Sequence, residues 1–150
     1  MTAEEPDVFV DTNVLVYLFD TSDPRRRDIA RGIVASRRGV VSTQVLSEFY
    51  VVATRKLAVP VPSAQAEAFV TGWPTTRVVP LTARLVGAAV ATSRAHQLNY
   101  WDALIIEAAA SAGCPVCLTE DLNDGATLRG VRITNPFTSD QPPTGVSRRM

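Results

Sequence analysis

Histidine, cysteine and lysine are scarce in this chain of 150 residues. It contains one histidine, His96, one lysine, Lys56, and two cysteines, Cys114 and Cys117. Two cysteines are too few for a disulfide framework or a zinc-binding cluster. The isolated histidine argues against hydrolysis by a Ser–His or Cys–His pair, because the nucleophile needs a positioned base beside it.

An excess of charge of one sign is also absent. The 15 basic residues balance the 15 acidic ones, so the net charge is zero. A bulk electrostatic attraction to nucleic acid is therefore excluded, and any such contact needs local clusters.

Long hydrophobic runs are missing as well. No segment approaches the ~20 apolar residues that span a bilayer. Three of the first seven residues are acidic and none is basic, which is not typical of a secretory signal. We therefore expect a cytoplasmic protein that has no membrane-spanning segment.

What the chain does contain favours one folded domain. Its hydrophobic fraction of 46% and charged fraction of 20% are those of a globular protein, and its length fits a single domain. Residues 138–150 are polar and rich in proline, which predicts a disordered tail. The predicted domain therefore covers residues 1–137.

Short apolar runs alternate with helical patterns along this domain. Helices are predicted over residues 13–20, 24–38, 43–56, 63–70, 82–96 and 101–112, with Gly39 ending the second. Strands are predicted at residues 8–10, 40–41, 77–79, 116–118 and 131–133. This alternation indicates a parallel sheet that is covered by helices on both faces.

Four carboxylates lie where solvation does not explain them. Asp11 ends a buried strand, Glu48 lies on an apolar helix, Asp102 belongs to the first turn of a mostly buried helix, and Asp121 follows the fourth strand. Ligands of parallel sheets bind outside the carboxyl ends of the strands. Asp11 and Asp121 therefore meet at one edge if their strands are neighbours.

Each carboxylate also has a simpler interpretation. Asp11 is a good helix N-cap, and Glu48 is a candidate for solvation or an ion pair. Asp102 is favoured in a first helical turn by the helix dipole. Asp121 and Asp124 are typical loop residues.

The combination of carboxylates argues for a cation. Carboxylates gathered in a partly apolar cleft repel one another and resist burial unless a cation neutralises them. Oxygen ligands select Mg²⁺ or Mn²⁺, and such ions orient water and stabilise charge on a phosphate. Thr12, Asn13 and Thr119 are candidates for the hydrogen bonds that aim the carboxylates.

Five segments carry a family resemblance. They are residues 8–17 with Asp11-Thr12-Asn13, residues 47–49 with Glu48, residues 100–109 with Asp102, residues 118–125 with Asp121, and Asn135-Pro136-Phe137. In order and spacing they resemble the motifs of PIN-domain ribonucleases and of the VapC-type toxins within that family. The resemblance extends from residue 7 to residue 137.

The resemblance implies a fold and a set of site residues. The implied fold is α/β, a three-layer α/β/α sandwich whose parallel five-stranded sheet has the order 3-2-1-4-5. The implied catalytic and metal-binding residues are Asp11, Glu48, Asp102 and Asp121, with Asp124 as an additional ligand and Thr12, Asn13 and Thr119 in support.

The resemblance also implies an activity and partners. The activity is hydrolysis of single-stranded or loop RNA, dependent on Mg²⁺ or Mn²⁺. The expected partners are a second copy of the chain in a homodimer and a cognate antitoxin protein that holds the toxin inactive.

Three other functions are alternatives for the same carboxylates. An aspartate-based phosphatase needs a second Asp two residues after its nucleophile, but Asp11 is followed by Thr12 and Asn13. A non-catalytic member of the same fold that binds RNA or protein is favoured only if one of the four carboxylates is lost. A nuclease of this fold that acts on DNA is a further alternative.

The remaining candidates are given structural roles. The Cys114–Cys117 pair enters a strand rather than opening a helix, so we expect burial and not redox activity. Packing is expected for the aromatic residues Tyr17, Tyr100 and Trp101, with base stacking or burial at a dimer interface as the alternatives. Solvated side chains are expected for Glu107 and Glu120, and also for Arg25, Arg26 and Arg27, for which contact with RNA phosphates is the alternative.

Overall fold

The computed structural model describes residues 5–138, so all but the first residue of the tail predicted over residues 138–150 lies outside the described part. Six α-helices form within it: α1 (Thr12–Val16), α2 (Pro24–Ala35), α3 (Thr43–Arg55), α4 (Ser63–Gly72), α5 (Ala83–His96) and α6 (Tyr100–Ser111). Two 3-10 turns, η1 (Tyr17–Phe19) and η2 (Thr75–Arg77), accompany them. The strands are β1 (Val8–Val10), β2 (Gly39–Ser42), β3 (Val78–Val79), β4 (Val116–Leu118), β5 (Thr127–Leu128) and β6 (Val131–Thr134).

The strands form one sheet in the order β3-β2-β1-β4-β6-β5. The five predicted strands are present, parallel and in the predicted order. The predicted count of five was wrong, because β5 adds a sixth strand that runs antiparallel to β6. A two-residue turn, Arg129-Gly130, joins β5 to β6, and both residues have positive φ, as tight hairpins require.

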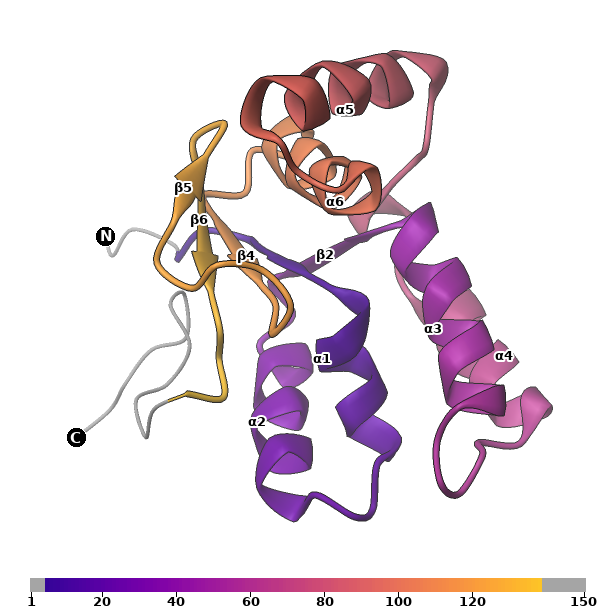
Figure 1. Ribbon diagram of the computed structural model, residues 1–150. Helices are drawn as coiled ribbons and strands as arrows, with labels where there is room; N and C mark the ends of the chain where they lie inside the picture. The colour runs from indigo at the N-terminus through magenta and orange to yellow at the C-terminus, as the bar shows by residue number, and fades with distance from the viewer. Residues whose placement is uncertain (1–4, 139–150) are drawn as a thin grey trace.

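Helices cover both faces of the sheet, which confirms the predicted three-layer arrangement. α5 and α6 lie together on one side, and α1 and α2 lie on the other (Figure 1). α3 follows β2 and packs against α1 and α4. Among the described residues no helix is both long enough and apolar enough to cross a bilayer.

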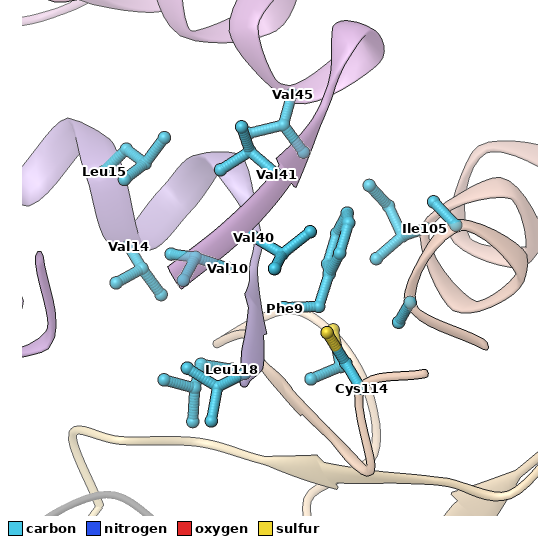
Figure 2. Packing of buried hydrophobic residues seen from close by; sticks show 14 of the residues in the cluster. Phe9, Val10, Val14, Leu15, Val40, Val41, Val45, Ile105, Cys114 and Leu118 are labelled. Atoms are coloured by element: carbon cyan, nitrogen blue, oxygen red, sulfur yellow. The ribbon is translucent and has the colours of Figure 1, made fainter. Parts of the chain in front are cut away.

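The core is divided between the two faces by the alternation of side chains along β1. Phe9 points toward Ile105 of α6, whereas Val10 points the other way, toward Val14 and Leu118 (Figure 2). All five side chains are at most 3% exposed. β1 is therefore buried on both faces, as expected of a central parallel strand.

The largest differences from the predicted element boundaries lie before β2. The predicted helix over residues 13–20 divides into α1 and η1. α2 ends at Ala35, and Gly39 begins β2 instead of ending the helix. A Cβ atom on Gly39 would lie 3.4 Å from the Trp73 ring, so glycine lets that ring cover the strand closely.

Candidate active site

Asp11 and Asp121 meet at the carboxyl edge of the sheet. β1 and β4 are adjacent, with Val10 beside Leu118, and the Asp11 N–H donates to the Leu118 carbonyl at 3.0 Å. Asp11 is also the N-cap of α1, because its Oδ1 accepts from the Thr12 N–H at 2.7 Å. The capping role and the place at the sheet edge are therefore compatible.

A polar network joins these two carboxylates. The Thr119 hydroxyl donates to Asp11 Oδ2 at 2.8 Å and accepts from the Asp121 N–H at 3.1 Å. Asn13 Nδ2 lies 3.0 Å from Asp121 Oδ2, 3.1 Å from Thr119 Oγ1 and 3.4 Å from Asp11 Oδ2. The three residues predicted to support the site, Thr12, Asn13 and Thr119, all hydrogen-bond to a carboxylate of the set.

Glu48 reaches the same region from α3. Its Oε2 accepts from the Thr12 hydroxyl at 3.2 Å, and its Oε1 accepts from Gln44 Nε2 at 2.8 Å. Gln44 is a supporting residue that the sequence prediction missed. Its position four residues before Glu48 on one helix is the signal that could have found it.

Asp102 completes the set from the first turn of α6. Asn99 caps this helix by accepting from the Trp101 N–H at 2.9 Å. Partial burial raises the pKa of Asp102, and the negative charges of Asp121 and Glu48 raise it further. The charge of Asp102 is therefore coupled to carboxylates on two other elements.

Asp11 has the most perturbed carboxyl group of the set. Its pKa rises from 3.8 to about 6, mainly because burial removes water from the charged form. Hydrogen bonds from Thr119 and Thr12 oppose this shift, and the charges of Asp121 and Glu48 add to it. The ionised form of Asp11 is thus costly without a compensating cation.

The donor set suits a hard divalent cation. None of the salt bridges within residues 5–138 involves Asp11, Glu48, Asp102 or Asp121, so no Lys or Arg in that part of the chain forms an ion pair with this set. In that part of the chain no group of three potential ligands is already close enough to hold an ion. Glu48 and Asp121 are exposed, so an ion can approach these two carboxylates from solvent.

Asp124 has a backbone partner outside the four carboxylates. Its Oδ1 accepts from the Asn135 N–H at 2.8 Å, which ties the loop after β4 to the end of β6. Its role as an additional metal ligand stays a prediction.

Glu120 and Arg26 were expected to be solvated, and that expectation was wrong. Arg26 Nε donates to Glu120 Oε2 at 2.8 Å, and the Tyr17 hydroxyl donates to Glu120 Oε1 at 2.7 Å. The Arg26 guanidinium also lies 5.4 Å from the centre of the Tyr17 ring and 5.5 Å from that of Phe137. Arg26 and Tyr17 therefore hold Glu120, the residue that precedes Asp121.

Glu107 was also expected to be solvated and is instead 4% exposed. It accepts from the Thr92 hydroxyl at 2.8 Å and from Arg129 Nε at 3.0 Å. The packing predicted for Trp101 was wrong too, because this side chain is 57% exposed. The spacing of apolar residues along α6 predicts neither the burial of Glu107 nor the exposure of Trp101, because the helix is buried on nearly every side beyond its first turn.

The two cysteines are free and buried, as predicted. Burial raises the pKa of the Cys114 thiol to about 11 and that of Cys117 well above its usual value. Their thiolates are therefore not available for redox exchange.

A PIN domain family model matches residues 8–123 of the chain. The chain belongs to the PIN-domain family. No curated protein matches it in sequence. The match covers all four carboxylates and ends two residues after Asp121.

Solved structures show the same PIN fold. The Mycobacterium tuberculosis toxin VapC20, described as cleaving the sarcin-ricin loop, is 24% identical with a TM-score of 0.62, over 77% of this chain and 92% of that one. A toxin–antitoxin complex from Klebsiella pneumoniae is 19% identical with a TM-score of 0.65, over 83% and 95%. FitAB bound to a DNA fragment is 16% identical with a TM-score of 0.65, over 89% and 98%.

Proposed function

We propose that this PIN-domain protein is an endoribonuclease that depends on Mg²⁺ or Mn²⁺ and acts as the toxin of a toxin–antitoxin pair. The observation that carries the proposal is the set of four carboxylates at the sheet edge. Each is brought there by a different element, and none of the salt bridges among the described residues neutralises it. An uncompensated set of this kind favours cation binding over a purely structural role.

Asp11, Glu48, Asp102 and Asp121 are the residues that would hold the ions. A bound divalent ion supplies Lewis-acid activation of water and stabilises negative charge on the phosphate. Asp11 is the rigid member, because Thr12 and Thr119 fix both of its oxygens. Asn13 positions Asp121 with its amide, and Gln44 and Thr12 position Glu48.

The relatives support the finer parts of the proposal. VapC20 is described as a toxin that cleaves the sarcin-ricin loop, which favours single-stranded or loop RNA as the substrate of this chain. The Klebsiella structure is a complex of toxin and antitoxin, which favours an antitoxin partner for this chain. We further propose a homodimer, as the resemblance to VapC-type toxins implies.

The test is cleavage of a pool of structured and single-stranded RNAs with Mg²⁺, with Mn²⁺ or with EDTA. We expect cutting with either ion, none with EDTA, and none by Asp102→Asn. This substitution removes one negative charge from the set and leaves the size of the side chain nearly unchanged. Cleavage by Asp102→Asn at the wild-type rate would contradict the assigned role of the carboxylate.

A second measurement separates a nuclease from a binding domain. If folded wild-type protein cuts no RNA in the pool, calorimetric titration with Mn²⁺ follows. Binding that Asp102→Asn weakens would keep the metal site and leave the substrate in question. Absence of both cleavage and metal binding would overturn the proposed function.

A further inference from the structure

Trp101 forms one wall of a pocket beside the proposed active site. The pocket has a volume of about 410 Å³ and is lined by Thr43, Gln44, Ser47, Glu48, Leu81 and Trp101. Its volume is within the range of small-molecule pockets, roughly 300–1,000 Å³. Because Glu48 belongs both to this pocket and to the carboxylate set, a ligand in the pocket lies directly beside the site.

Trp101 is exposed although burial would stabilise it. It is 57% exposed, compared with 39% for the exposed aromatic residue Tyr50. Tyr100 supports it from one side, with the two ring centres 5.0 Å apart and an angle of 71° between the planes. A large apolar ring held at the rim of a pocket offers a face for stacking.

The chemistry of the lining excludes an anionic group. None of the six lining residues is basic, and Glu48 is an acid, so a phosphate or a carboxylate would be repelled. The Trp101 ring and Leu81 provide apolar surface, and the other lining side chains are polar. This combination suits a flat, uncharged group that has polar edges.

The pocket also has hydrogen-bonding capacity that the fold does not use. The Thr43 hydroxyl accepts from the Leu81 N–H, and the Ser47 hydroxyl donates to the Thr43 carbonyl. The Thr43 proton and the Ser47 lone pairs are therefore available, which matches the mixed donors and acceptors of a base edge.

We propose that this pocket binds one nucleobase of the RNA, stacked on Trp101 next to the phosphate that is cut. The proposal rests on the proposed function and deepens it, because it assigns a subsite for the substrate. Single-stranded RNA is recognised by splayed bases that stack on aromatic side chains. Trp101 immediately precedes Asp102, so one turn of α6 would position both the base and the adjacent site.

The test measures RNA binding separately from cleavage. The probes are labelled single-stranded 12-mers of uridine and of adenosine, titrated with Mg²⁺ into Asp102→Asn so that they stay intact. We expect Trp101→Ala in this background to weaken binding at least about fivefold, because removal of one stacking partner costs that much or more. Trp101→Phe keeps an aromatic face and is expected to retain most of the affinity.

Val59→Ala is the matched control. Val59 is an exposed apolar residue in the loop at the far end of α3, and its side chain is 70% exposed. We expect no change in affinity for this variant. Thermal melting of all variants checks folding, and little change is expected for Trp101→Ala because its side chain is largely in solvent.

A second readout uses fluorescence of the tryptophan itself. The chain has two tryptophans, so Trp73→Phe leaves Trp101 as the only indole. We expect the 12-mers to quench this emission until the site is saturated, as stacking requires. The concentration for half-saturation should agree with that from the labelled probes.

The failures of the two proposals are distinguishable. Equal affinity of Trp101→Ala and its parent, together with unquenched emission, would overturn the nucleobase subsite while metal-dependent cleavage stands. Quenching with neither cleavage nor metal binding by wild-type protein would support the subsite and overturn the proposed nuclease. If Trp101→Ala changes only the sedimentation coefficient and not RNA affinity, the ring covers an interface between protein chains and the subsite is overturned.

Discussion

Arg26 and Glu120 form an ion pair that ties the start of α2 to the residue before Asp121. Arg26 also bonds Asp23, the N-cap of its own helix, at 3.0 Å, and the Glu120 N–H donates to Asn13 Oδ1 at 3.0 Å. The loop that carries Asp121 is thus held from two sides. The side chains of this pair are 35% and 22% exposed, so its main effect is on geometry rather than on stability.

Arg26→Ala is expected to lower the cleavage rate. Without Arg26, the Glu120 side chain keeps only the hydrogen bond from the Tyr17 hydroxyl. The position of Asp121 then becomes less defined. We expect kcat to fall roughly tenfold, as for other residues that support a metal ligand, with a small change in KM. A double-mutant cycle with Glu120→Gln checks the mechanism, and fully additive effects would contradict it.

Asn13→Ala is expected to have a larger effect. Asn13 is the residue that hydrogen-bonds both to Asp121 and to the backbone of Glu120. We expect about 10- to 100-fold loss of cleavage activity and a similar loss of Mn²⁺ affinity. Asn123→Ala, an exposed residue in the loop after β4, is the matched control. Activity within twofold of wild type for Asn13→Ala would show that its amide is dispensable.

The pKa of Asp11 predicts how stability depends on pH in EDTA. The folded-state pKa of about 6 lies above the usual 3.8, so the folded chain binds more protons between these values. The resulting stabilisation is complete below about pH 3.8 and is lost as the pH rises through 6. It amounts to on the order of 3 kcal/mol.

Urea unfolding at pH 5 and pH 7 measures this contribution. We expect the free energy of unfolding of the wild-type protein to decrease from pH 5 to pH 7, and that of Asp11→Asn to decrease less. We also expect Mg²⁺ to stabilise the wild-type protein more at pH 7 than at pH 5, because cation and proton compete. An identical pH dependence in Asp11→Asn would show that another group is responsible.

Glu107→Ala is expected to destabilise the fold without affecting chemistry. Glu107 joins α5 and the β5–β6 turn through Thr92 and Arg129. Truncation leaves the Thr92 hydroxyl without this partner and opens a small cavity, which we expect to cost about 2 kcal/mol. Chemical denaturation measures the loss, with Glu67→Ala on the exposed face of α4 as the control. A cleavage rate reduced along with stability, when both are measured well below the melting temperature, would link Glu107 to the site.

The parallel sheet could be predicted because its strands are short apolar runs bounded by polar residues. The sequence around Asp11 illustrates this: β1 is wholly apolar and stops at the carboxylate. β5 could not be predicted in the same way, since Thr127 and Leu128 are too few residues to show a period. Its strand exists because the Arg129-Gly130 turn folds it back onto β6.

The site was predictable only as a list of residue types. Asp11 and Asp121 follow predicted strands directly, so topology alone brings these two carboxylates to one edge. The partners of Glu120 could not be found in this way, because Arg26 and Tyr17 lie 94 and 103 residues away in the chain. Glu107 illustrates the opposite limit: the apolar residues around it show that α6 is buried, but not that Thr92 and Arg129 satisfy its charge.

The two outer strands have a consequence for assembly. β3 and β5 are each only two residues long, so each border of the sheet offers a very small template for an added strand. Short borders of this kind resist edge-to-edge aggregation. A protein partner of this chain is therefore expected to bind through side chains on its helices and loops, and its affinity should respond to surface substitutions more than to the backbone pairing of an added strand.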